Sequence, residues 1–198
     1  MISRYMNSYM TSDEELIKKV KTGDDMAFQE LMSRYTKHIF NFILQYVKSR
    51  EEAEDVSQDT FFKTWKYMKR FKDGMKFKPW LFTIARNTAL DYIKKKKAIT
   101  FSSMESDEDD NFNFADTLSD NDPLPPELFA RKELANELSE AMTDLHPDHK
   151  SVLMMHYHED MTFEEISEIM KKPMNTVKSW HHRSLSKVKT KLLHRKSS

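Results

Sequence analysis

The chain has 198 residues, with 32 basic and 32 acidic side chains and therefore a formal net charge of zero. It contains no cysteine, which excludes a disulfide framework and a thiolate zinc site. Its apolar runs are far shorter than the roughly 20 residues of a membrane span, and residues 1–10 lack the pattern of a secretory signal peptide. We therefore expect a cytoplasmic protein without membrane insertion. Scarce glycine and abundant Lys, Glu, Met and Leu predict an all-α fold.

The charges are segregated along the chain. Residues 1–97 carry 20 basic and 13 acidic side chains, residues 98–130 carry nine acidic and no basic ones, and residues 131–198 carry 12 basic and 10 acidic ones. The middle block also contains three prolines, a composition that cannot bury enough apolar surface to offset chain entropy. We expect two small helical domains, residues 1–97 and 131–198, joined by a flexible acidic linker at 98–130.

The N-terminal domain begins with two predicted helices. Ser12 and Glu15 form a capping-box pattern that starts the first helix, and Gly23 ends it. The second helix follows from an apolar stripe at three- and four-residue steps, which runs from Phe28 to about Lys48.

A third helix is predicted after Ser49, and its faces differ. One face should supply the core through Val56, Phe61, Trp65 and Met68. The other is a mixed polar and apolar strip suited to binding another protein, although ordinary surface is an open alternative. The strip consists of Asp55, Gln58, Asp59 and Phe62.

A fourth helix should open at Pro79 and end in the four lysines at 94–97. Between residues 60 and 97 there are twelve Lys or Arg, two acidic residues and interspersed aromatic residues. Cations bind phosphates and aromatic faces stack on unpaired bases, so this combination suits single-stranded or melting DNA. Most of the aromatic side chains are nevertheless expected in the core.

The C-terminal domain ends in a predicted helix-turn-helix. Thr162 and Glu165 form a second capping box, and Pro173 should end the first helix near Lys172. Asn175 or Thr176 should cap a second helix that runs to about Leu193. Residues 169–198 carry nine Lys or Arg and no acidic side chain, which favours binding to DNA over a merely solvated helix.

Three segments, in this order, resemble those of a bacterial RNA polymerase sigma factor. The resemblance is to the sigma-70 family, extracytoplasmic-function or group-four type. Residues 52–65 resemble the helix of domain two that binds core polymerase. Residues 77–87 resemble the segment that melts and reads the minus-ten element. The helix-turn-helix resembles domain four, which reads the minus-thirty-five element and binds the polymerase flap.

The resemblance implies a non-catalytic specificity subunit, without cofactor or metal, that directs core RNA polymerase to promoters and assists melting. The α-helical strip Asp55, Gln58, Asp59 and Phe62 would bind the clamp helices of the polymerase. Asn87 would hold a flipped base of the single-stranded non-template strand. The DNA-binding set implied is Lys76, Lys78, Arg86 and Asn87 in domain two, and Thr176, Lys178, Ser179, Trp180, His182 and Arg183 in domain four. The linker would thread toward the active-site and RNA-exit channel as a nucleic-acid mimic.

Three residues depart from the family pattern. Trp180 and Leu185 stand where the family usually has Arg, and His181 stands at a position that is usually aliphatic. Weak or altered reading of the minus-thirty-five element is expected, with the exposed Trp180 indole available to a separate DNA-bound recruiting partner. An anti-sigma factor is a further candidate partner. His181 is expected to be a partly buried histidine without a role.

Two other function classes compete with this interpretation. A two-domain helix-turn-helix regulator could bind DNA without polymerase, but it leaves the strip on the third helix and the acidic linker unexplained. A nuclease could use the carboxylates at 107–110 to bind a divalent metal, but no catalytic His, Ser or Lys accompanies them.

Overall fold

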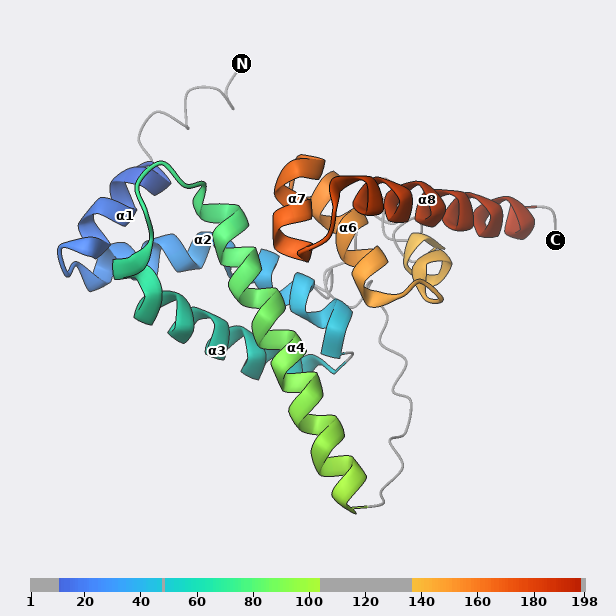
Figure 1. Cartoon of the computed structure of the whole chain (residues 1–198), viewed down its shortest axis with the longest axis horizontal. Helices are drawn as coiled ribbons and strands as arrows, with labels where there is room; N and C mark the ends of the chain where they lie inside the picture. The colour runs from blue at the N-terminus through green and yellow to red at the C-terminus, as the bar shows by residue number, and fades with distance from the viewer. Residues whose placement is uncertain (1–10, 48, 104–136, 197–198) are drawn as a thin grey trace, which may run out of the picture.

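The computed structural model describes residues 11–47, 49–103 and 137–196, and these residues form helices and turns without a strand. The predicted all-α fold class is therefore confirmed for this part of the chain (Figure 1). In addition to a short helical stretch at 137–142, the elements are α1 (Asp13–Lys21), α2 (Asp25–Val47), α3 (Arg50–Tyr67), a 3-10 turn (Met68–Arg70), α4 (Phe77–Ser103), α6 (Pro147–Tyr157), α7 (Phe163–Met170) and α8 (Met174–Lys196).

The helix starts that follow a capping box lie where the sequence predicts them. Ser12 caps α1 and Thr162 caps α7, and in both cases a Glu three residues later completes the reciprocal hydrogen bonds. Gly23 follows α1 with a φ of 96°, a conformation that glycine adopts without steric cost.

The second helix of the predicted helix-turn-helix begins earlier than expected. The structure starts α8 at Met174, and the Pro173 carbonyl accepts hydrogen bonds from the backbone N–H groups of Thr176 and Val177. Neither Asn175 nor Thr176 is the cap, so that prediction was wrong. The physical reason is that Pro173 directly precedes the helix and its carbonyl accepts the first hydrogen bonds of the helix. The preceding helix ends at Met170, and Lys171 takes a left-handed conformation with φ 52°.

The predicted core face of α3 is confirmed at Val56, Met68 and the half-buried Phe61 but not at Trp65. Its buried residues are small or polar: Ala53, Val56, Ser57, Thr60 and Thr64. The hydroxyls of Thr60 and Thr64 donate to carbonyls one turn earlier, at 2.7 and 2.8 Å, so burial leaves them satisfied. Trp65, expected in the core, is 52% exposed, because its position lies outside this narrow face.

Helix α4 is longer than predicted at both ends. It begins at Phe77, which places Pro79 in the first turn, and it continues six residues past Lys97 to Ser103. Glu52 on α3 contacts the second half of α4: it accepts a hydrogen bond from Tyr92 at 3.0 Å and forms an ion pair with Lys96 at 3.1 Å. The rest of the predicted linker lies outside the described residues, as does the acidic run at 107–110.

The N-terminal helices pack against the C-terminal helices. Helix α7 lies on α4 and α6 lies on α2, and Figure 1 shows α4 running between α3 on one side and α7 on the other. One continuous buried cluster extends from Leu16 on α1 to Val177 on α8. A smaller cluster, Ala141, Leu145, Leu153 and Val188, supports α6 and α8. We call the part formed by α1–α4 the N-terminal half and the part formed by α6–α8 the C-terminal half.

Within the described part of the chain, no helix has both the length and the apolar character needed to cross a membrane.

Candidate polymerase and nucleic-acid interfaces

The predicted protein-binding strip lies on one exposed face of α3. Asp55 is three and four residues from Gln58 and Asp59, which are in turn four and three residues from Phe62, and all four side chains are exposed. The Phe62 ring is 59% exposed, and Trp65 extends the face with its ring centroid 6.3 Å from that of Phe62. Sequence reasoning missed Trp65 as a surface residue, although its spacing of three from Phe62 could have indicated it. Two neighbouring exposed aromatic rings beside carboxylates are typical of a protein interface.

The cations predicted to bind DNA in the N-terminal half are all engaged with the C-terminal half. The Lys76 ammonium lies 2.7 Å from the Glu165 carboxylate. Arg86 lies 3.1 Å from Asp148. The structure thus places a carboxylate where the resemblance places promoter DNA.

Lys78 has a comparable partner in the turn between α6 and α7. Its ammonium lies 2.7 Å from one carboxylate oxygen of Glu159 and donates to the Glu159 backbone carbonyl at 2.8 Å. The other carboxylate oxygen contacts Nδ1 of His38 and Nδ1 of His158 at 2.8 and 2.9 Å. Burial raises the pKa of Glu159, but the hydrogen bonds from Lys78 and the two histidines outweigh burial and bring its pKa below the usual value.

The Arg86–Asp148 pair is also largely enclosed, with side chains 9% and 19% exposed. Arg86 is buried, and the Tyr46 hydroxyl also donates to Asp148, at 3.3 Å. Burial raises the pKa of Tyr46, so its hydroxyl stays a donor at neutral pH. A buried charge pair with an additional hydrogen bond resists separation, because removal of one partner leaves an uncompensated charge.

The aromatic residues of the basic segment mostly support the core, as predicted. Phe71 and Phe77 are buried, and the half-buried Trp80 ring packs on both, with centroid distances of 5.0 and 5.8 Å. Asn87, the residue predicted to hold a flipped base, is half-buried next to Arg86 on α4.

Helix α8 presents a cationic face to solvent. Lys178, His182 and Arg183 are exposed, whereas Thr176 and Ser179 are half-buried. The Arg183 guanidinium donates to the Ser179 hydroxyl at 2.7 Å, which orients it along the helix. Three of the six predicted reading residues are therefore fully accessible in the described arrangement.

Trp180 is not the exposed side chain that was predicted. It is half-buried against the main core, and its ring centroid lies 5.1 Å from that of His149. The next residue, His181, is half-buried as expected, in contact with the rings of His156, Tyr157 and Phe163. Burial and the neighbouring histidines lower its pKa. The indole therefore helps to close the core of the C-terminal half, because helix period turns residue 180 inward from the face of Lys178 and His182.

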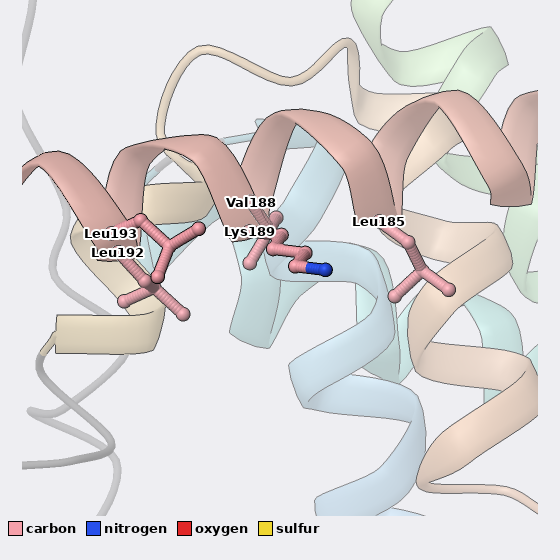
Figure 2. Close-up of a pocket in the computed structure, with 5 residues that line it drawn as sticks. All are labelled: Leu185, Val188, Lys189, Leu192 and Leu193. Carbon is pink, nitrogen blue, oxygen red and sulfur yellow. The ribbon is translucent and has the colours of Figure 1, made fainter.

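An apolar groove of about 270 Å³ lies along the second half of α8 (Figure 2). It is lined by Leu185, Val188, Lys189, Leu192 and Leu193. Leu193 is 57% exposed and Leu185 is 38% exposed, so the groove opens to solvent. Leu185, noted in the sequence as a missing cation, contributes an apolar wall here.

A helix-turn-helix with a basic second helix, together with a second helical bundle that carries its own cations, defines a helical DNA-binding protein. Comparison with known proteins specifies the class further. Residues 31–99 match the family described as Sigma-70 region 2, and residues 135–188 match Sigma-70, region 4.

Whole-length relatives agree with these two regions. The chain is 28% identical over 176 residues to the ECF RNA polymerase sigma factor SigW of Bacillus subtilis (strain 168), covering 89% of this chain and 94% of that one. It is 29% identical over 182 residues to the ECF RNA polymerase sigma-E factor of Haemophilus influenzae, covering 91% and 95%. The chain belongs to the sigma-70 family of sigma factors and is of the ECF type.

A solved structure shares the fold. The sigma factor RpoE of Bartonella quintana, in complex with the anti-sigma factor NepR, aligns with a TM-score of 0.65 at 20% identity, covering 83% of this chain and 96% of that one.

Proposed function

We propose that this protein is a sigma factor that directs core RNA polymerase to specific promoters and assists promoter melting. The observation that carries the proposal is the order of regions 2 and 4 on one chain, with an exposed polar and aromatic strip on α3. The protein would act as a non-catalytic specificity subunit. Core polymerase and promoter DNA lie in the bacterial cytoplasm, so we propose that the protein acts there.

Each surface has a proposed role. The strip Asp55, Gln58, Asp59 and Phe62 binds polymerase, and Trp65 extends it. In the N-terminal half Lys76, Lys78, Arg86 and Asn87 bind the minus-ten element. In the C-terminal half Thr176, Lys178, Ser179, His182 and Arg183 contact the minus-thirty-five element, and the half-buried Trp180 supports them by fixing the orientation of α8. The apolar groove on α8 suits an apolar polymerase segment such as the flap.

A DNA-binding regulator that acts without polymerase is the alternative. The α3 strip argues against it, because a protein that binds only DNA has no use for two exposed aromatic rings beside three polar groups. The proposal includes regulation by an anti-sigma factor, since a protein inserted between α4 and α7 would hide the same cations.

We further infer that the described arrangement is a closed form of the free protein. Glu159, Glu165 and Asp148 neutralise the three cations that the proposal assigns to promoter DNA. Phosphates and these carboxylates compete for the same donors, so promoter binding requires α7 to leave α4. The α3 strip is exposed in the closed form. Polymerase can therefore bind before opening.

Reconstituted transcription tests the function directly. Core polymerase with the protein should initiate from a discrete set of sites in a promoter library, whereas core polymerase alone should not. If the protein binds some of these DNAs but never changes initiation by core polymerase, the regulator without polymerase contact is the better description.

Asn87→Ala should lower open-complex formation on duplex promoters by about tenfold, since the loss of one bidentate base contact costs about 1–3 kcal/mol. A template with a preformed bubble should restore only part of the loss, because melting and base capture are separate costs. Permanganate footprinting of unpaired thymines measures both. The matched control is Gln29→Ala, an exposed amide on α2. Equal footprints for Asn87→Ala and wild type would remove this role.

A further inference from the structure

Three side chains converge at the contact between the two halves of the protein. His38 lies on α2, and His158 and Glu159 lie in the turn that joins α6 to α7. One ring nitrogen of each histidine and a carboxylate oxygen of Glu159 all lie within 4.8 Å of one another. Sequence patterns could not predict this group, since 120 positions separate His38 from His158.

The backbone fixes the positions of the two residues in the turn. His158 and Glu159 both donate their N–H groups to the Met154 carbonyl, at 2.9 and 3.2 Å, and Met161 donates to Met155 at 3.0 Å. Lys78 holds the second carboxylate oxygen and the backbone carbonyl of Glu159. The Glu159 carboxylate is therefore oriented by a partner outside the group, as is usual for carboxylates that bind metals.

The donor atoms select a particular class of ion. Two imidazole nitrogens and one carboxylate oxygen suit Zn²⁺, Co²⁺ or Ni²⁺ rather than Mg²⁺ or Ca²⁺, which prefer oxygen ligands only. The side chains of His38 and His158 are 37% and 49% exposed, so an ion and a water ligand can reach the site, while the Glu159 side chain is fully buried.

The spacing requires a local rearrangement of the two imidazole rings. The Glu159 oxygen lies 2.8 and 2.9 Å from the two nitrogens. Bonds of about 2.0–2.1 Å in a tetrahedral site separate ligand atoms by about 3.3 Å. Each imidazole nitrogen would thus move about half an ångström away from the Glu159 oxygen, and the two nitrogens would come to about the same 3.3 Å from each other. The partial exposure of both histidine side chains allows these movements.

We propose that His38, His158 and Glu159 form a binding site for a divalent transition-metal ion of the Zn²⁺, Co²⁺ or Ni²⁺ class. The bound ion connects α2 to the α6–α7 turn and stabilises the closed form. A fourth ligand, water, completes the coordination. A bound ion would thereby oppose promoter binding, a consequence that rests on the proposed function. The binding of the ion does not rest on it.

Titration of the full chain tests the site, with Zn²⁺ followed by calorimetry and Co²⁺ by its visible absorption. One equivalent should bind. His38→Ala, His158→Ala and Glu159→Gln should each weaken binding at least about tenfold, because three protein ligands are the minimum of such sites. His194→Ala on α8 is the matched control and should leave the affinity unchanged. Circular dichroism checks that His38→Ala, the change at a half-exposed residue, remains folded. Absence of binding to the wild-type protein, or wild-type affinity in all three variants, overturns the proposal.

A distance measurement tests the connection between the halves. The chain has no cysteine, so dyes can be attached specifically at Met26→Cys on α2 and Thr190→Cys on α8. The distance between the two dyes reports whether the halves are closed or open. At a Zn²⁺ concentration ten times the Kd, the open fraction should fall about tenfold, and a chelator should reverse the change. His158→Ala should abolish the response. Binding of Zn²⁺ without any change in the open fraction overturns the connecting role. Neither the titration nor the distance measurement contains polymerase or DNA. A negative result in either one therefore does not contradict the proposed function.

Discussion

The double change Asp55→Lys with Gln58→Ala should abolish co-purification with core RNA polymerase. Both side chains are exposed on α3, so their replacement leaves the helix and its buried face intact. The change reverses one charge and removes one amide at the centre of the proposed interface. Central interface residues contribute about 2–4 kcal/mol each, so the affinity should fall by at least about 100-fold. Affinity purification of core polymerase measures the loss, and circular dichroism should show unchanged helicity.

The chain offers a closely matched control for this experiment. Glu14→Lys with Gln29→Ala makes the same kinds of change at exposed positions of α1 and α2, outside the strip. Full binding by the control and none by the strip variant would locate the interface on α3. If the strip variant binds polymerase as wild type does, the contact lies elsewhere, and the exposed Phe62 and Trp65 need another explanation.

Local rules predicted the elements of the fold well. The capping boxes at Ser12 and Thr162 satisfy backbone donors within one turn, so the four residues involved specify the helix start without help from the rest of the protein. The α3 strip was found for the same reason, because helix period alone places Asp55, Gln58 and Phe62 on one face. Its aromatic neighbour Trp65 was misplaced because α3 buries threonines rather than a large apolar stripe.

The closed arrangement could not be predicted from the sequence. Asp148, Glu159 and Glu165 look like ordinary helix-end and turn carboxylates, and they pair with cations 62, 81 and 89 positions away. Sequence patterns reach only about four positions along a helix. The same limit applies to Trp180, whose orientation depends on contact with His149 of a different helix. Whether the predicted DNA-binding residues are paired or free, and exposed or buried, therefore depends on how the helices of the two halves pack.

Asp148→Lys should open the closed form. The substitution places a second cation against the buried Arg86 and removes the acceptor of the Tyr46 hydroxyl. Loss of one partner of a buried pair costs about 3 kcal/mol when partial solvent screening is allowed for, so the ratio of closed to open molecules should fall about 100-fold. The variant should have a larger radius of gyration in small-angle scattering. It should also bind single-stranded minus-ten DNA more tightly than wild type without polymerase.

Two further variants separate opening from a general effect of charge. Asp144→Lys reverses an exposed carboxylate that pairs with Lys191 inside the C-terminal half, so it should leave the protein closed. Exchange of the pair, Arg86→Asp with Asp148→Arg, should restore the compact dimensions, because opposite charges again face each other across the contact. A compact Asp148→Lys variant without any gain in single-strand binding would mean that the apolar contact of α4 with α7 holds the halves together on its own. The three ion pairs would then be surface features of a permanently joined molecule rather than a barrier to promoter binding.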